Sequence, residues 1–128
     1  AFVNIGLVPD SGGTWLLPHK IGMARAIGLA MLGEKLPAPQ AEQWGLIWKC
    51  VDDDRLDAEV DALATRLAAM PTRALGFIKH AFASAATQSF SAQLDLERDM
   101  QAELSRSHDY LEGVEAFLQK RAPRFQGR

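Results

Sequence analysis

A single carboxylate, Asp10, lies within a glycine-rich turn that separates an apolar run from a helical pattern. The apolar run at residues 2–8 predicts a buried strand or strand end, which Pro9 stops because proline has no backbone donor. Asp10 and Ser11 are suited to cap the helix that begins near Thr14. A carboxylate fixed at such a turn can move protons, so Asp10 is the candidate catalytic residue. A turn and cap without chemistry is the alternative.

A second cluster of chemically useful residues lies at the C-terminal end of the sequence. It combines basic side chains with two aromatic rings: Phe117, Lys120, Arg121, Arg124, Phe125 and Arg128. Cations bind phosphate and aromatic rings contact flat groups, so the cluster indicates a site for a phosphate-bearing ligand with a ring. A solvated basic tail is the alternative interpretation.

Composition excludes several function classes. The 128 residues carry a formal net charge of -2 and 48% hydrophobic side chains, which favours a soluble globular chain and argues against a nucleic-acid surface. No apolar stretch is long enough to span a membrane, and the default location is the cytoplasm. Three histidines and one cysteine stand at spacings that suit no metal: His19, His80, His108 and Cys50. We therefore expect no metal site.

The elements that must position these residues are mostly helical. Apolar residues at helical spacing predict helices near residues 24–32, 40–44, 56–70, 75–85, 96–104 and 110–118. In the helix at 24–32 the predicted buried face consists of Ala24, Ile27, Gly28, Met31 and Leu32. Residues 46–51 are the one later strand candidate. The pattern predicts a first part at 1–54, with the Asp10 turn, and a helical part at 55–128.

Several segments, in this order, resemble the C-terminal half of the crotonase (enoyl-CoA hydratase/isomerase) superfamily: residues 6–13, 21–26, 41–47, 112–117 and 120–125. The likeness spans the whole chain and is strongest to isomerases of phenylacetate degradation. It implies an α/β fold, a spiral of ββα turns. Residues 1–54 would form the last core turn, and 55–128 the mainly α-helical region that builds trimers, often paired as hexamers.

The resemblance also assigns roles. Asp10 matches an acidic residue that shuttles a proton in the family's isomerases, whereas Phe2 stands where typical hydratases carry a glutamate. Phe117 and Lys120 match positions that approach CoA, commonly from a neighbouring subunit. The two backbone donors that hold the thioester oxygen come from segments upstream of Ala1 in the family. We therefore expect this chain to be a fragment that is inactive alone.

The expected reaction is the isomerisation of a CoA thioester, the ring-1,2-epoxide of phenylacetyl-CoA giving the oxepin-CoA. An enoyl-CoA hydratase and a Δ3,Δ2-enoyl-CoA isomerase are the enzymatic alternatives, and a noncatalytic oligomerisation module is the alternative of another class. The implied partners are the acyl-CoA substrate and further copies of the chain, and no separate cofactor is needed because CoA is part of the substrate. Phe2, Val8 and Trp15 are expected to form an apolar wall beside Asp10.

Overall fold

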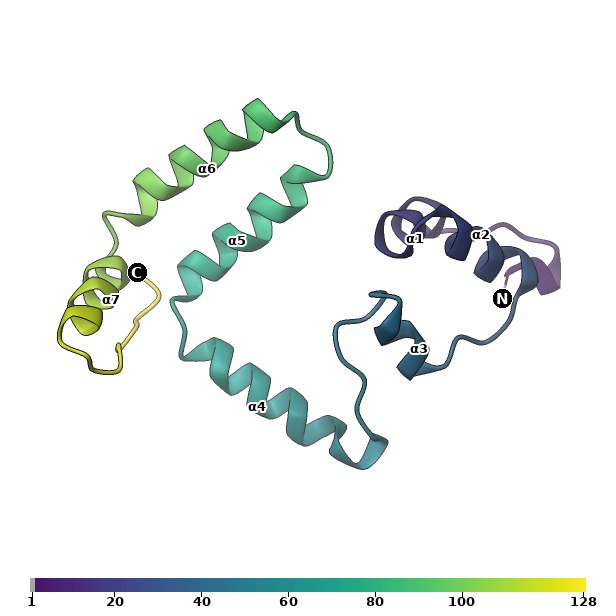
Figure 1. The fold of residues 1–128 in the computed structure, drawn as a ribbon, viewed down its shortest axis with the longest axis horizontal. Helices are drawn as coiled ribbons and strands as arrows, with labels where there is room; N and C mark the ends of the chain where they lie inside the picture. The colour runs from purple at the N-terminus through teal and green to yellow at the C-terminus, as the bar shows by residue number, and fades with distance from the viewer. Residues whose placement is uncertain (1) are drawn as a thin grey trace. The chain divides into compact units, whose positions relative to one another are not determined.

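The computed structural model describes residues 2–128, and the chain divides into two compact units, Ala1–Leu56 and Asp57–Arg128. We call them the N-terminal unit and the C-terminal unit. Within residues 2–128 all regular structure is helical and no strand forms (Figure 1).

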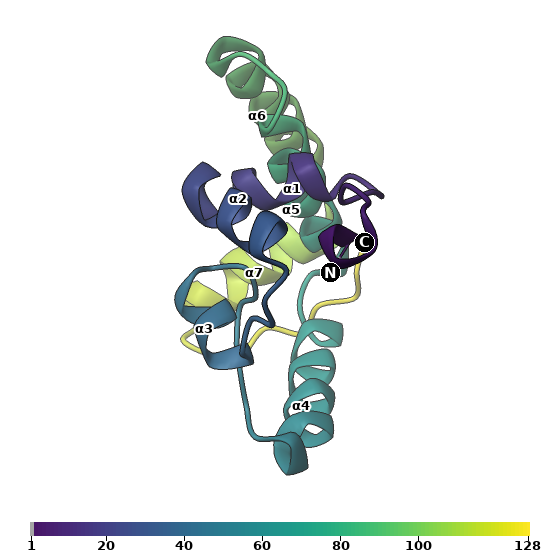
Figure 2. The same cartoon turned by 90° about the vertical axis from the view of Figure 1, so that its right-hand side faces the viewer.

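The N-terminal unit is built around two neighbouring helices. Its elements in chain order are η1 (Phe2–Ile5), α1 (Gly13–Ile21), α2 (Met23–Leu32), α3 (Ala38–Gln43) and η2 (Asp53–Arg55). The helices α1 and α2 pack side by side, and η1 contacts α2 (Figure 1 and Figure 2). Gly22 joins the two helices at a positive φ of 81°, and its N–H closes α1 on the Pro18 oxygen at 3.0 Å. This pair of helices carries the loop that holds Asp10.

The two strand predictions are wrong for the residues that the structure describes. The apolar run begins with the 3-10 helix η1, whose end is closed by bonds from Gly6 N to Val3 O and from Leu7 N to Phe2 O, each 3.0 Å. Residues 46–51 form bends and extended coil after α3. A strand needs a lateral partner for its backbone groups, whereas local turns satisfy the groups of η1 here. The described chain therefore shows helices and not the ββα spiral.

The helix predicted at 24–32 forms, but it uses a different face for packing within the unit. Ile27, Met31 and Leu32 of the predicted buried face are 48%, 68% and 67% exposed. Ala26 is buried instead. The apolar period predicted the helix correctly, whereas the choice of face depends on α1, whose position the period does not contain.

The C-terminal unit contains four longer helices, and each of them corresponds to a helix predicted from the apolar spacing; α4 ends two residues before its predicted end. They are α4 (Leu56–Ala68), α5 (Thr72–Ala85), α6 (Phe90–Leu104) and α7 (His108–Leu118). The helices α5 and α6 run side by side, and Gln93 of α6 donates to the Ala81 oxygen of α5 at 3.1 Å (Figure 1). Ser89 and Ser107 cap α6 and α7, because their Oγ atoms accept from N–H groups of the first turn.

The last ten residues, 119–128, form an irregular segment that we call the tail. It turns back after α7 and ends beside the start of that helix, where Asp109 N donates to the Arg128 oxygen at 3.0 Å (Figure 1). Phe125 of the tail lies over the helix at Gly113, where an added Cβ would stand 3.6 Å from the ring. The tail and α7 therefore form one local structure.

Candidate functional site

Asp10 lies in the loop between η1 and α1, and main-chain bonds hold this loop. The Asp10 carbonyl oxygen accepts from Gly13 N at 2.8 Å, and the Gly12 oxygen accepts from Leu16 N at 2.8 Å. Gly12 has a φ of 82°, and Ser11 reaches 51°, a left-handed conformation that is uncommon for a residue with a side chain. The Asp10 side chain is exposed and has no hydrogen bond or ion pair with any other described residue. Its carboxylate is therefore available to a ligand.

The predicted capping role of Asp10 and Ser11 is wrong. The N-cap of α1 is Gly12, and no side chain caps this helix. The left-handed conformations of Ser11 and Gly12 place the start of the helix beyond both side chains. This correction weakens the purely structural interpretation of Asp10, because a cap would have engaged its carboxylate.

A hollow of about 650 Å³ in the N-terminal unit is lined by Asp10. Most of its wall is apolar, with Phe2, Leu16, Leu17, Leu29, Leu46 and Ile47 among the lining residues. The expected wall is confirmed for Phe2. Val8 does not line the hollow, and neither does Trp15, whose ring instead stacks on His19 with 4.0 Å between centroids. A carboxylate at the edge of an apolar concavity is a common arrangement for binding and converting a small acyl group.

Three charged residues of this hollow were missed in the sequence: Lys20, Glu34 and Lys35. Lys20 follows the lining residues Leu16 and Leu17 at helical spacing, so the face of α1 could have predicted it. Glu34 and Lys35 directly follow α2, and no local pattern places them near Asp10.

Phe117 and Lys120, the second pair of predicted site residues, lie at the end of α7. Phe117 is 82% exposed and lines a separate hollow of about 450 Å³ in the C-terminal unit, together with Tyr110, Val114 and Phe125. Lys120 lies outside this lining, on the turn that follows α7. Its side chain is exposed and pairs with no described residue. Phe117 thus has a concavity beside it, and Lys120 provides an available charge.

The turn at Lys120 is a Schellman motif, in which two main-chain bonds close the end of a helix. Lys120 N donates to Phe117 O at 3.2 Å, and Arg121 N donates to Ala116 O at 3.0 Å. Lys120 occupies the left-handed position of this motif, with a φ of 53°, where glycine is the usual residue. A side chain there costs roughly 1–2 kcal/mol.

Glu112 of α7 binds the tail on the far side of this turn. Its carboxylate accepts from Arg121 Nη1 at 2.6 Å and Nη2 at 2.9 Å, and from Arg124 N at 2.7 Å. The bonds to Arg121, followed by the bond from Arg124 N, lower the pKa of Glu112 to about 2. Arg121 is therefore committed to Glu112 and is not one of the free cations that the sequence indicated.

Asp109, one turn earlier in α7, holds the end of the tail. Its side chain is buried, and it accepts from Gln126 N at 2.7 Å and Gly127 N at 2.8 Å. Burial acts to raise its pKa, but these two N–H bonds and the neighbouring His108 outweigh it, so the pKa lies below the usual value. The sequence analysis missed both carboxylates. The Ser107 cap places Asp109 in the first turn of a helix, but nothing local links it to residues 126 and 127.

Two negative findings concern the same described residues. Within residues 2–128 no three histidine, cysteine or acidic side chains gather as a metal site would require. No helix formed by these residues has the length and apolar character needed to cross a membrane.

Similarity to known proteins identifies the family to which the chain belongs. The chain belongs to the enoyl-CoA hydratase/isomerase family, whose model matches residues 1–128. Among solved structures, enoyl-CoA hydratase subunit I of Geobacillus kaustophilus HTA426 superposes with a TM-score of 0.95 at 39% identity, covering 99% of this chain and 49% of that one. The crotonase resemblance is confirmed at the level of family and of the matching half of the fold.

Two relatives of known sequence are similar to the chain over its whole length. The chain is 56% identical over 128 residues to the 1,2-epoxyphenylacetyl-CoA isomerase of Escherichia coli K12, covering 100% of this chain and 49% of the relative. It is 48% identical to a protein of Rhodobacter capsulatus named as a probable enoyl-CoA hydratase, covering 100% of this chain and 50% of that protein. The chain thus spans about half the length of the curated relatives it matches.

Proposed function

We propose that the full-length protein containing this chain is a CoA-thioester isomerase that converts ring-1,2-epoxyphenylacetyl-CoA to the oxepin-CoA. The observation that carries the proposal is the Asp10 carboxylate at an apolar hollow, where it pairs with no other residue that the structure describes. The identity of 56% to a relative named for this epoxide supports the choice of substrate.

Asp10 would act as an acid and base. A proton next to a thioester can be removed when the resulting enolate oxygen is held by preorganised backbone donors, which contribute several kcal/mol. In this proposal the two donors come from outside residues 1–128, and Asp10 takes a proton at one position and returns it at another. With the ring epoxide, the same carboxylate assists opening to the seven-membered oxepin. All atoms of the substrate are retained, as isomerisation requires.

Enoyl-CoA hydration is the second candidate function. Water addition to a double bond needs a base for the water and an acid for the adjacent carbon, and Glu34 is a second carboxylate that lines the same hollow as Asp10. Phe2 favours isomerisation, because an apolar side chain lines the hollow where the family resemblance places a hydratase glutamate.

The C-terminal unit would serve substrate binding and assembly. We place Phe117 against the flat ring of CoA and Lys120 near a phosphate, with the protein acting as a trimer or hexamer in the cytoplasm. Exposed apolar side chains of α7 support a subunit contact, because Leu111, Phe117 and Leu118 are 63%, 82% and 74% exposed. No cofactor besides the CoA of the substrate enters this proposal.

The test is Asp10→Asn in the full-length protein, assayed for turnover of the ring-epoxide CoA thioester. We expect a loss of about 10²–10⁴-fold, the usual contribution of a general acid or base. Asp52→Asn is the matched control, since Asp52 is also exposed and makes no capping bond. Equal turnover of the Asp10 variant and the wild type would remove the catalytic assignment.

Isotope labelling separates the candidates. In ¹⁸O-labelled water, a hydratase incorporates the label into its product and an isomerase does not. The module of the other class predicts that the full-length protein assembles yet neither binds nor converts CoA esters. Product mass and subunit number measured on one preparation distinguish all three.

A further inference from the structure

We infer that Glu112 and Asp109 are positioning residues, which fix the tail so that Lys120 is held ready for a phosphate group of the substrate. The inference rests on the proposed function, in which Lys120 binds the CoA part of the thioester. It adds that residues within α7, which point toward the tail and not toward a ligand, set the affinity of that site.

Lys120 has a left-handed backbone conformation. A left-handed lysine persists only where the surrounding structure enforces it, and such outliers concentrate at functional positions. Glycine would close the same helix end without the backbone cost, so the turn retains a side chain despite that cost. An available ammonium group is what this side chain adds.

Glu112 enforces the turn at Lys120 through its bonds to the tail. Arg121 directly follows Lys120, and its two Nη nitrogens both donate to Glu112, a two-bond geometry that fixes orientation as well as distance. The same carboxylate holds Arg124 N at 2.7 Å. Glu112 thus fixes the chain at two points within the four residues that follow Lys120, which prevents the turn from relaxing.

Asp109 fixes the end of the tail. Asp109 binds the N–H groups of Gln126 and Gly127, one to each carboxylate oxygen. Gly127 has a φ of 74°, and a Cβ added there would lie 2.5 Å from Thr72 Oγ1 at the start of α5. The tail is therefore held along its length and cannot move away from α7 without breaking these bonds.

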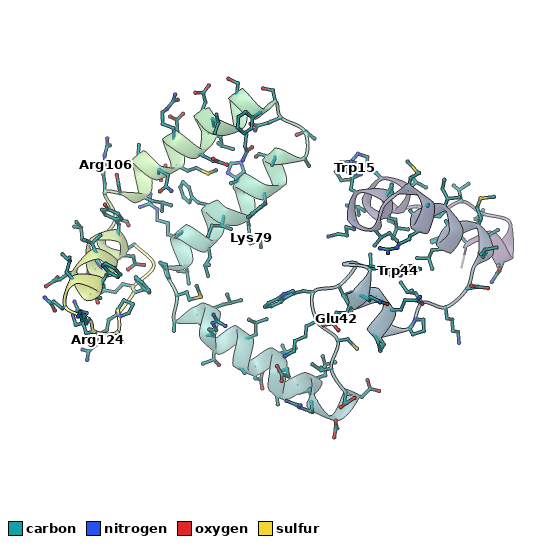
Figure 3. The ribbon with its side chains drawn as sticks, in the orientation of Figure 1. Trp15, Glu42, Trp44, Lys79, Arg106 and Arg124 are labelled. Atoms are coloured by element: carbon teal, nitrogen blue, oxygen red, sulfur yellow. The ribbon has the colours of Figure 1, made fainter. Side chains whose placement is uncertain are left out.

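The cationic side chains of the tail differ in whether a carboxylate neutralises them. Glu112 neutralises Arg121, whereas the side chains of Lys120 and Arg124 pair with no residue that the structure describes. Figure 3 shows Arg124 on the tail beside α7. Lys120 and Arg124 are thus two cations, unpaired among the described residues, on a segment that Glu112 fixes to α7 and that lies close in sequence to the exposed ring of Phe117. A phosphate or pyrophosphate attached to a flat ring matches this arrangement.

The experiment measures binding of coenzyme A by calorimetry to the full-length protein, so that no turnover is required. Glu112→Gln removes the charge that holds Arg121 while keeping the size of the side chain. We expect its dissociation constant to rise about three- to tenfold, with kcat at saturating thioester unchanged. Glu97→Gln is the matched control, because Glu97 lies on α6 and bonds only to Gln93 among the described residues, at 3.5 Å; it should bind like the wild type.

Two further variants keep the inference testable. Arg121→Gln breaks the same pair from outside the helix and should raise the dissociation constant equally, even if Glu112→Gln folds poorly. In a Lys120→Ala background, Glu112→Gln should raise the dissociation constant by less than it does in the wild type, because a positioning residue acts through the groups it positions and one of them is then absent.

The outcomes separate the inference from the function on which it rests. If Lys120→Ala weakens binding but Glu112→Gln and Arg121→Gln do not, the positioning role is overturned while the proposed site stands. If the wild type does not bind coenzyme A, the proposed function and the inference both fall. An additive effect of Glu112→Gln in the Lys120→Ala background would also overturn positioning.

Discussion

The two turns that carry the candidate residues are built in opposite ways. Each contains a left-handed residue with a side chain, Ser11 at 51° and Lys120 at 53°. At the Asp10 turn, main-chain bonds and Gly12 hold the chain, and no side-chain bond is present among the described residues. At the Lys120 turn, Glu112 and the tail hold the chain through side-chain bonds.

This difference separates carboxylates that can do chemistry from carboxylates that build structure. Asp109 and Glu112 each accept bonds from N–H groups of the tail on both carboxylate oxygens. Asp10 lines an apolar hollow, and its carboxylate oxygens accept no bond from any other described residue. The availability of the oxygens therefore identifies the reactive acid better than the residue type does.

The largest predicted effect tests this separation directly. Asp10→Asn should lower kcat of the full-length protein by about 10²–10⁴-fold and leave its melting temperature within about 1 °C. The small thermal effect is expected because the carboxylate bonds to none of the residues 2–128. Scanning calorimetry and steady-state kinetics on one preparation provide both readings. A large fall in melting temperature would show that Asp10 is a structural residue after all.

Asp109→Ala should show the reverse behaviour. Removing the buried carboxylate leaves the N–H groups of Gln126 and Gly127 without their acceptor, so the melting temperature should fall by several degrees. Turnover at saturating substrate should stay within about twofold of the wild type, since this acid contacts no substrate in our proposal. Asp99→Ala is the control on the exposed face of α6, where Asp99 bonds only to Arg98 among the described residues. Loss of turnover without loss of stability would contradict the structural assignment.

The pH dependence of stability should also distinguish the regions. Glu112 has a folded-state pKa of about 2 against 4.5 for the free side chain, so its stabilising contribution is fully present above pH 4.5 and is lost as the pH falls towards 2. The difference in melting temperature between the wild type and Glu112→Gln should therefore shrink across that window. Thermal melts at intervals from pH 6 to pH 2 follow it. A difference that stays constant would show that charge on Glu112 does not hold the tail.

The helices were predicted correctly, but the two predicted strands do not form within residues 2–128, and the bonds of Glu112 and Asp109 to the tail were not predicted. The reason is the range of the interactions. The apolar residues that predict α5 recur on successive turns of one continuous segment. The capping residue Ser89 directly precedes the helix that it caps. A strand at 46–51 depends on a partner strand, which local patterns do not contain. Elements were therefore predictable where neighbours in sequence are also neighbours in space.

The candidate site follows the same rule. Asp10 could be found because proline and glycine mark its turn locally. The bond between Glu112 and Arg121 crosses a reversal of the chain, and the Asp109 bonds reach residues 126 and 127, so no period relates them. Phe117 was predicted by resemblance, and its exposure of 82% agrees with a role outside the core of its own unit.

A smaller effect is expected from the charge of Lys120. Lys120→Ala should weaken coenzyme A binding by about three- to tenfold at low salt and by less at high salt, because exposed charges are screened within about 10 Å at 0.1 M ionic strength. Lys79→Ala is the control, since Lys79 is an exposed lysine on α5 and does not belong to the tail (Figure 3). Dissociation constants at several salt concentrations test the prediction. An unchanged constant across salt would remove the phosphate role of Lys120.

The smallest predicted effect is on the free energy of unfolding, when each of the two left-handed residues, Ser11 and Lys120, is replaced by glycine. Ser11→Gly and Lys120→Gly should each relieve the backbone cost of a side chain at positive φ and raise the free energy of unfolding by about 1 kcal/mol. If only Lys120 serves through its side chain, Lys120→Gly gains stability and loses affinity for coenzyme A, whereas Ser11→Gly gains stability and keeps turnover and affinity. Denaturant melts and calorimetric titration of both variants give the comparison. A Ser11→Gly protein that is more stable but slower would mean that the strained serine holds Asp10 in place, and the Asp10 turn would then depend on its left-handed residue as the Lys120 turn does.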